Sequence, residues 1–66
     1  MALVVIRKYL AETEPFISYC YYGGRMYYRT HLCWRSARCY AECRGEDWHW
    51  GNIKDIARKQ SWLVII

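Results

Sequence analysis

The sequence lacks any catalytic or cofactor motif of high specificity. It contains no Cys-x-x-Cys pair, although it has four cysteines. The pairing of Cys33 with His31 is a candidate for nucleophilic catalysis, but no acidic residue is evident to orient the histidine. A chain of 66 residues also leaves little room for an enclosed pocket. We therefore expect a protein that is not an enzyme and needs no cofactor.

Long hydrophobic runs are also missing. The apolar stretch Ala2–Ile6 is interrupted by Arg7 and Lys8, which is unlike a secretory signal. The apolar stretch Trp62–Ile66 is far too short to span a bilayer. The sequence predicts no membrane partner, a cytoplasmic location and cysteines that remain free thiols.

Proline occurs once, and large apolar side chains are abundant. Seven tyrosines and four tryptophans can each bury a large area while keeping a polar tip for hydrogen bonding. Such a composition excludes a disordered chain. We expect residues 1–66 to form one small domain with a narrow margin of stability.

Acidic residues are absent between Pro15 and Ala41. The same window holds four arginines, whereas the rest of the chain has six basic and six acidic residues. The net charge of +4 therefore comes entirely from this window. A local excess of arginine is typical of a surface that binds phosphates or acidic proteins.

The window begins with the clearest local signal, a β-hairpin over Phe16–His31. Gly23 and Gly24 suit a two-residue turn, which places Tyr22 opposite Arg25. We expect the core face of the hairpin to carry Ile17, Tyr19, Tyr21, Met26, Tyr28 and Thr30. We expect the outer face to carry Phe16, Ser18, Cys20, Tyr22, Arg25, Tyr27, Arg29 and His31.

Strands and helices are expected on both sides of the hairpin. The predicted elements are a strand over Ala2–Leu10, a turn over Ala11–Pro15, a helix over Leu32–Arg44, a connector over Gly45–Gly51, a helix over Ile53–Gln60 that begins at the cap residue Asn52, and a strand over Ser61–Ile66. This order, βββααβ, predicts an α+β fold with two helices packed on one face of a small antiparallel sheet. The apolar end strands could pair with each other or form a homodimer through their edges.

The candidate binding residues combine arginine with aromatic rings. They are Arg25, Arg29, Tyr22, Tyr27, Arg35, Arg38, His31 and Trp48. Stacking rings interleaved with arginine suit nucleic acid, and we expect this small basic protein to bind nucleic acid or a nucleic-acid-handling complex. Tyrosine, tryptophan and arginine are also enriched in protein interfaces. The alternative is therefore a protein-binding inhibitor that docks on an acidic protein surface, of the phage or mobile-element type, such as an anti-CRISPR protein.

A structural zinc site is a further alternative. Its candidate ligands are Cys33, Cys39, Cys43 and His49, and a small domain gains stability from such a metal. Cys39 and Cys43 are one helical turn apart, but two thiolates need two further ligands. The spacing therefore favours a protein without metal.

Overall fold

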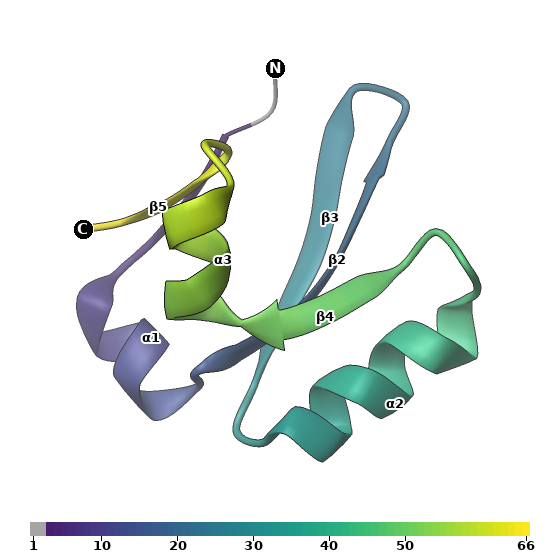
Figure 1. The fold of residues 1–66 in the computed structure, drawn as a ribbon, viewed down its shortest axis with the longest axis horizontal. Coiled ribbons are helices and arrows are strands. Elements are labelled where there is room, and N and C mark those ends of the chain that lie inside the picture. The colour runs from purple at the N-terminus through teal and green to yellow at the C-terminus, as the bar shows by residue number, and fades with distance from the viewer. Residues whose placement is uncertain (1–2) are drawn as a thin grey trace.

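Two small β-sheets and three helices make up the fold of residues 3–66, the part of the chain that the computed structural model describes (Figure 1). In chain order the elements are β1 (Val4–Ile6), α1 (Lys8–Thr13), β2 (Phe16–Tyr22), β3 (Arg25–His31), α2 (Trp34–Arg44), β4 (His49–Asn52), α3 (Ile53–Lys59) and β5 (Leu63–Ile65). The predicted α+β class is confirmed.

The hairpin of β2 and β3 has the predicted register. Tyr22 lies opposite Arg25, and pairing continues to Phe16 opposite His31. Gly23 and Gly24 have φ angles of 60° and 79°, a left-handed conformation that glycine adopts without strain. The other edge of β2 pairs with β4, a short antiparallel strand inside the segment predicted as a connector, so the sheet order is β3-β2-β4.

The first predicted strand is shorter than expected. It ends at Ile6, and α1 then occupies most of the segment predicted as strand end and turn, while Ala2 lies outside the described residues. The segment Lys8–Thr13 contains good helix formers, and Ala11 is buried against the core. The two apolar end strands pair with each other: β1 runs parallel to β5, with Val4 opposite Leu63.

The main hydrophobic core lies on the Ile17 face of the hairpin. Its buried members are Val4, Ile6, Ala11, Ile17, Ile53, Ile56 and Leu63. They come from β1, α1, β2, α3 and β5, and the half-buried Tyr19 and Met26 of the hairpin pack against them. The prediction that this face of the hairpin meets the core is therefore confirmed for its central residues.

The opposite face of the hairpin is also covered, which the sequence did not predict. Helix α2 lies against β2, β3 and β4 and buries Ala37 and Ala41 on the sheet side. Beneath it, Ser18, Cys20 and His31 are buried, although we expected them on an outer surface. The helices thus occupy both faces of the sheet. Small or polar side chains at these strand positions resemble a solvent face in sequence, but they leave room for a helix to approach closely.

None of the helices within residues 3–66 is long and apolar enough to cross a membrane. The longest, α2, has 11 residues.

Candidate functional site

The end of the hairpin projects beyond the rest of the sheet (Figure 1). Strand β4 pairs with β2 only as far as Tyr19, so within residues 3–66 no further strand lies beside residues 20–28. Four tyrosines of this segment are between 45% and 71% exposed, namely Tyr21, Tyr22, Tyr27 and Tyr28. Tyr21 and Tyr28 were predicted to face the core, but the core does not extend this far along the hairpin. We call residues 21–28 the hairpin tip.

One face of the hairpin tip leads onto helix α2 through alternating arginines and rings. The guanidinium of Arg25 lies 5.9 Å from the ring centre of Tyr27, and that of Arg29 lies 5.5 Å from the ring centre of Tyr40 on α2. Arg44 stacks closely on the same Tyr40 ring, at 3.4 Å. These distances are within the range of cation–π contacts. We call Tyr22, Arg25, Tyr27, Arg29, Tyr40 and Arg44 the Arg–Tyr strip.

Four of the predicted binding residues belong to this strip, and two predicted arginines contact other parts of the chain. Arg35 lies over the ring of Trp34, 5.5 Å away, and Arg38 forms an ion pair of 3.3 Å with Glu42. Both contacts are made within helix α2. Arg38 is thus partly neutralised, whereas the strip contains no carboxylate.

Tyr40 and Arg44 were not predicted as binding residues. Arg44 falls just after the acid-free window, and Tyr40 lies on the helix that follows the hairpin. Their spacing of four residues was the available signal, because it puts them on adjacent turns of one helix face. The Arg44 guanidinium also donates a hydrogen bond of 3.3 Å to the Tyr40 carbonyl.

His31 was predicted to contact a ligand, but its side chain is only 8% exposed. The Ser18 hydroxyl and the His31 Nε2 atom are 2.8 Å apart in a buried hydrogen bond. Burial lowers the pKa of His31, and the nearby positive charges of Arg29 and Arg44 lower it further against the opposing effect of Glu14. The His31 ring, which this lowered pKa keeps neutral, packs against the ring of Tyr40, with 5.2 Å between the ring centres.

Trp48, another predicted binding residue, is half-buried at the side of the strip. Its ring meets that of Tyr40 edge-on at 5.6 Å, and the guanidinium of Arg44 lies 5.8 Å from it. The neighbouring Trp50 is 40% exposed and stacks on Trp34 at 6.2 Å. Trp48 thus holds Tyr40 and Arg44 in position.

The candidate metal ligands are divided between the two faces of the sheet. Cys39 and Cys43 lie in a shallow depression with Arg29, His31 and Arg44, whereas His49 packs against Tyr19 on the other face. Among residues 3–66 no group of three or more His, Cys, Asp or Glu side chains is arranged to hold a metal ion. All four cysteines are free thiols.

The thiols differ in environment. Cys33 is exposed at the start of α2, and a hydrogen bond of 3.4 Å with the Ser36 hydroxyl lowers the pKa of its thiol. A hydrogen bond with Cys43 raises the pKa of the Cys39 thiol. Cys20 is buried in the sheet.

Comparison with protein-family models, with curated proteins and with solved structures finds no match to this chain.

Proposed function

We propose that the protein binds single-stranded nucleic acid through the Arg–Tyr strip, as a binding protein and not as an enzyme. Exposed aromatic rings bind unpaired bases by stacking, and arginines bind the phosphates between them. Bases in a duplex are already stacked on each other, which makes the exposed rings of the strip better suited to an unpaired strand.

The observation that carries this proposal is the repeated placement of a guanidinium over a ring. It occurs at Arg25 on Tyr27, and at both Arg29 and Arg44 on Tyr40. A stacked guanidinium can keep most of the N–H groups at its edge available, and these groups match the oxygen atoms of a phosphate; in Arg44 one of them already bonds to the Tyr40 carbonyl. With no carboxylate in the strip, an anionic strand meets no repulsion there.

Fluorescence anisotropy with a labelled 12-nucleotide single strand, in DNA and RNA form, tests the proposal. We expect binding at low salt, and three phosphate contacts predict a slope of about −2 for the logarithm of affinity against the logarithm of salt concentration. A matched hairpin duplex should bind more weakly. A protein partner recognised through the same rings would instead give a much flatter salt dependence.

Two double variants distinguish binding through the Arg–Tyr strip from non-specific attraction to the net positive charge. Arg25→Glu with Arg29→Glu should abolish binding, while Lys54→Glu with Lys59→Glu on α3 makes the same change in net charge away from the strip. Replacing Tyr22 or Tyr27 by Ala should weaken binding by roughly tenfold, the usual loss of one stacking ring. Equal losses in both charge-reversed variants, with the fold preserved by circular dichroism, would refute the assignment of the strip. No binding of either strand at low salt would refute the proposal itself.

A further inference from the structure

A sizeable cavity lies on the face of the sheet opposite to the Arg–Tyr strip. Its volume is about 840 Å³, which is comparable to that of ligand pockets in proteins. It is lined by Tyr19, Tyr21, Met26, Glu46, Asp47, His49, Gln60 and Trp62. The cavity therefore combines an apolar, aromatic floor with two carboxylates.

The core of the protein holds the aromatic floor in place. Tyr19 packs against both Trp62 and His49, with ring centres 4.9 Å and 5.6 Å away. Burial raises the pKa of Tyr19, so its phenol remains neutral at physiological pH. These rings lie too close together to enclose a ligand between them, but their outer faces can receive a cation by cation–π attraction.

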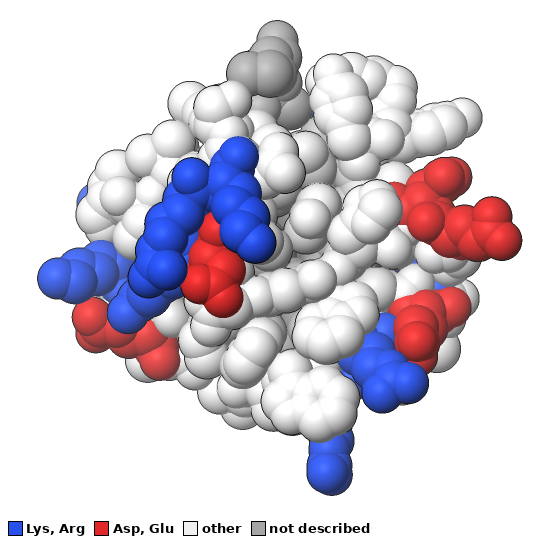
Figure 2. Space-filling model, viewed as in Figure 1, with Lys and Arg blue, Asp and Glu red and all other residues white. Residues whose placement is uncertain are grey.

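The charge around the cavity is opposite to that of the whole protein. The chain has ten Lys and Arg and six Asp and Glu residues, yet this cavity is lined by two acidic side chains and His49, with no Lys or Arg. In Figure 2, acidic residues stand at the right edge, where the chain passes from α2 to β4, with a basic side chain beside the lower of them, and basic and acidic residues are mixed on the left over α3. A cation is therefore the ligand charge that this cavity complements.

The cavity also borders a free strand edge. Pairing of β4 with β2 ends at His49 opposite Tyr19, and no strand in the described part of the chain pairs with that edge of the next β2 residues, Cys20–Tyr22. The chain that leads into β4 from α2 diverges from the hairpin here (Figure 1). An extended peptide can pair with such an edge and place alternate side chains on one face of the sheet.

We propose that this cavity binds an arginine side chain of an extended, basic peptide segment of a partner protein. The guanidinium lies over the rings of Tyr19 and Trp62 and pairs with the carboxylates of Glu46 and Asp47. The peptide backbone runs beside the free edge of β2. This site is independent of the proposed nucleic-acid surface, and the two lie on opposite faces of the sheet. The protein could in this way hold a nucleic acid on one face and a basic protein on the other.

Titration of the full chain with a short synthetic peptide, acetyl-Ala-Arg-Ala-Arg-Ala-amide, tests the proposal. Its control is the same peptide with citrulline, a neutral analogue of arginine. Two-dimensional NMR follows the indole N–H signals of the four tryptophans. We expect the arginine peptide to shift the Trp62 signal and to leave that of Trp34, on the other face, unchanged. We expect the citrulline peptide to bind at least roughly tenfold more weakly.

Two double variants test whether the cavity carboxylates bind the arginine peptide. Glu46→Gln with Asp47→Asn should lower the affinity for the arginine peptide by roughly tenfold or more. Glu12→Gln with Glu42→Gln removes the same number of exposed carboxylates elsewhere and should leave its affinity nearly unchanged. Both pairs lie on the surface, so neither is expected to disturb the core.

Several results would overturn the inference. They are equal affinity for the arginine and citrulline peptides, equal losses in the two double variants, or shifts confined to Trp34 and Trp50. Binding of free N-acetyl-arginine amide as tightly as the peptide would show that the ligand is a small cation and not a peptide segment. None of these results depends on whether the Arg–Tyr strip binds nucleic acid.

Discussion

The Ser18 hydroxyl and the His31 imidazole form a buried hydrogen bond between neighbouring strands, with 2.8 Å between Oγ and Nε2. Ser18 is fully buried and His31 nearly so, beneath helix α2. The bond satisfies two polar groups that would otherwise be costly to bury. It also fixes the imidazole below Tyr40, the ring shared by Arg29 and Arg44. A polar pair on the sheet thus supports the centre of the Arg–Tyr strip.

Replacing Ser18 by Ala should lower the free energy of unfolding by about 1–3 kcal/mol, because the buried imidazole loses its partner. Urea unfolding followed by tryptophan fluorescence measures this loss. Thr13→Ala is a suitable control, since its exposed hydroxyl bonds only to backbone within α1 and its loss should cost less than about 0.5 kcal/mol. A Ser18→Ala variant as stable as the original protein would show that the bond is not important for the fold.

Stability should decrease as the pH falls below about 6.5, the ordinary pKa of histidine. Burial, with Arg29 and Arg44 nearby, lowers the pKa of His31 in the folded protein. Below pH 6.5 the unfolded chain therefore takes up a proton at His31 that the folded protein does not, which favours unfolding. Urea unfolding at pH 7.5, 6.0 and 5.0 should reveal the decrease.

The variant His31→Gln should lose most of this pH dependence, although its overall stability is lower. The variant His49→Gln retains His31 and should keep the decrease. If His31→Gln shows the same slope with pH as the original protein, the acid sensitivity arises from other groups.

Cys33 should react with iodoacetamide faster than Cys39 at pH 7.5. The hydrogen bond with Ser36 lowers the pKa of the Cys33 thiol, whereas the hydrogen bond with Cys43 raises that of Cys39, and the thiolate is the reactive form. Peptide mass spectrometry after timed alkylation measures both rates, with the buried Cys20 expected to react last. Ser36→Ala should slow the alkylation of Cys33 and leave that of Cys39 unchanged. Faster alkylation of Cys39 than of Cys33 in the original protein would contradict the pKa directions assigned to the two thiols.

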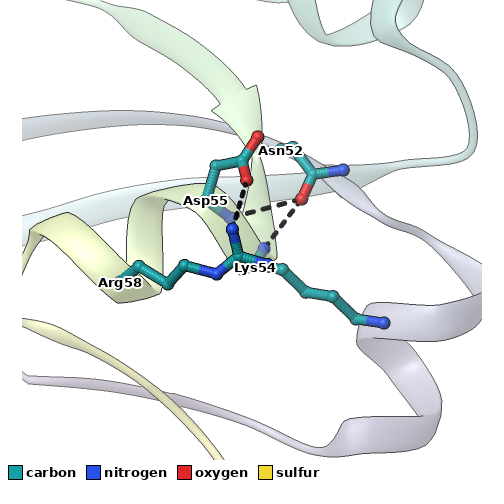
Figure 3. A network of polar contacts seen from close by, with 4 residues as sticks. All are labelled: Asn52, Lys54, Asp55 and Arg58. Carbon is teal, nitrogen blue, oxygen red and sulfur yellow. Dashed lines mark hydrogen bonds and ion pairs between the residues drawn. The ribbon is translucent and has the colours of Figure 1, made fainter.

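Asn52 should contribute to stability as the cap of α3, as predicted from the sequence. Its side-chain oxygen accepts hydrogen bonds from the backbone N–H groups of Lys54 at 2.9 Å and Asp55 at 3.3 Å (Figure 3). Asn52→Ala should therefore lower the free energy of unfolding by about 1 kcal/mol, and Asn52→Asp should restore most of it. Thermal unfolding of the three proteins provides the measurement, and an Asp variant no better than Ala would argue against capping.

Asp55 occupies the third position of α3, where an acidic side chain can complete a capping box by accepting a hydrogen bond from the backbone N–H of the cap residue. Instead it lies 3.5 Å from the Arg58 guanidinium, one turn further along α3 (Figure 3). Both side chains are largely exposed, so this ion pair adds little to stability.

The hairpin was predictable because its register depends on local chemistry. Two glycines fix the turn, and alternation along each strand then assigns every side chain to a face. The same alternation does not reveal what covers each face. Ser18, Cys20 and His31 are small or polar, and only the packing of Ala37 and Ala41 of α2 shows that they belong to a second buried layer.

Helix α1 and strand β4 were missed for a related reason. Both are short, with six and four residues, and their conformation depends on distant partners more than on their own pattern. Strand β4 forms because Gly51 and Trp50 lie beside Ile17 and Ser18, which are far away in the chain. For the binding surface, sequence located the arginines and tyrosines of the hairpin, but Tyr40 and Arg44 join them only through the crossing of α2 over the sheet.

The parallel pairing of β1 with β5 has a consequence for the order of folding. Val4 finds its partner only in Leu63, and the core that both strands cover contains Ile17 and Ile53 from the middle of the chain. As the chain is synthesised, the hairpin and α2 can assemble from local contacts, but β1 waits until residues 63–65 have emerged. Contacts between such distant residues slow folding, because a long loop must close first. During that interval the apolar residues of β1 stay uncovered, which makes the newly made chain vulnerable to aggregation until β5 has emerged.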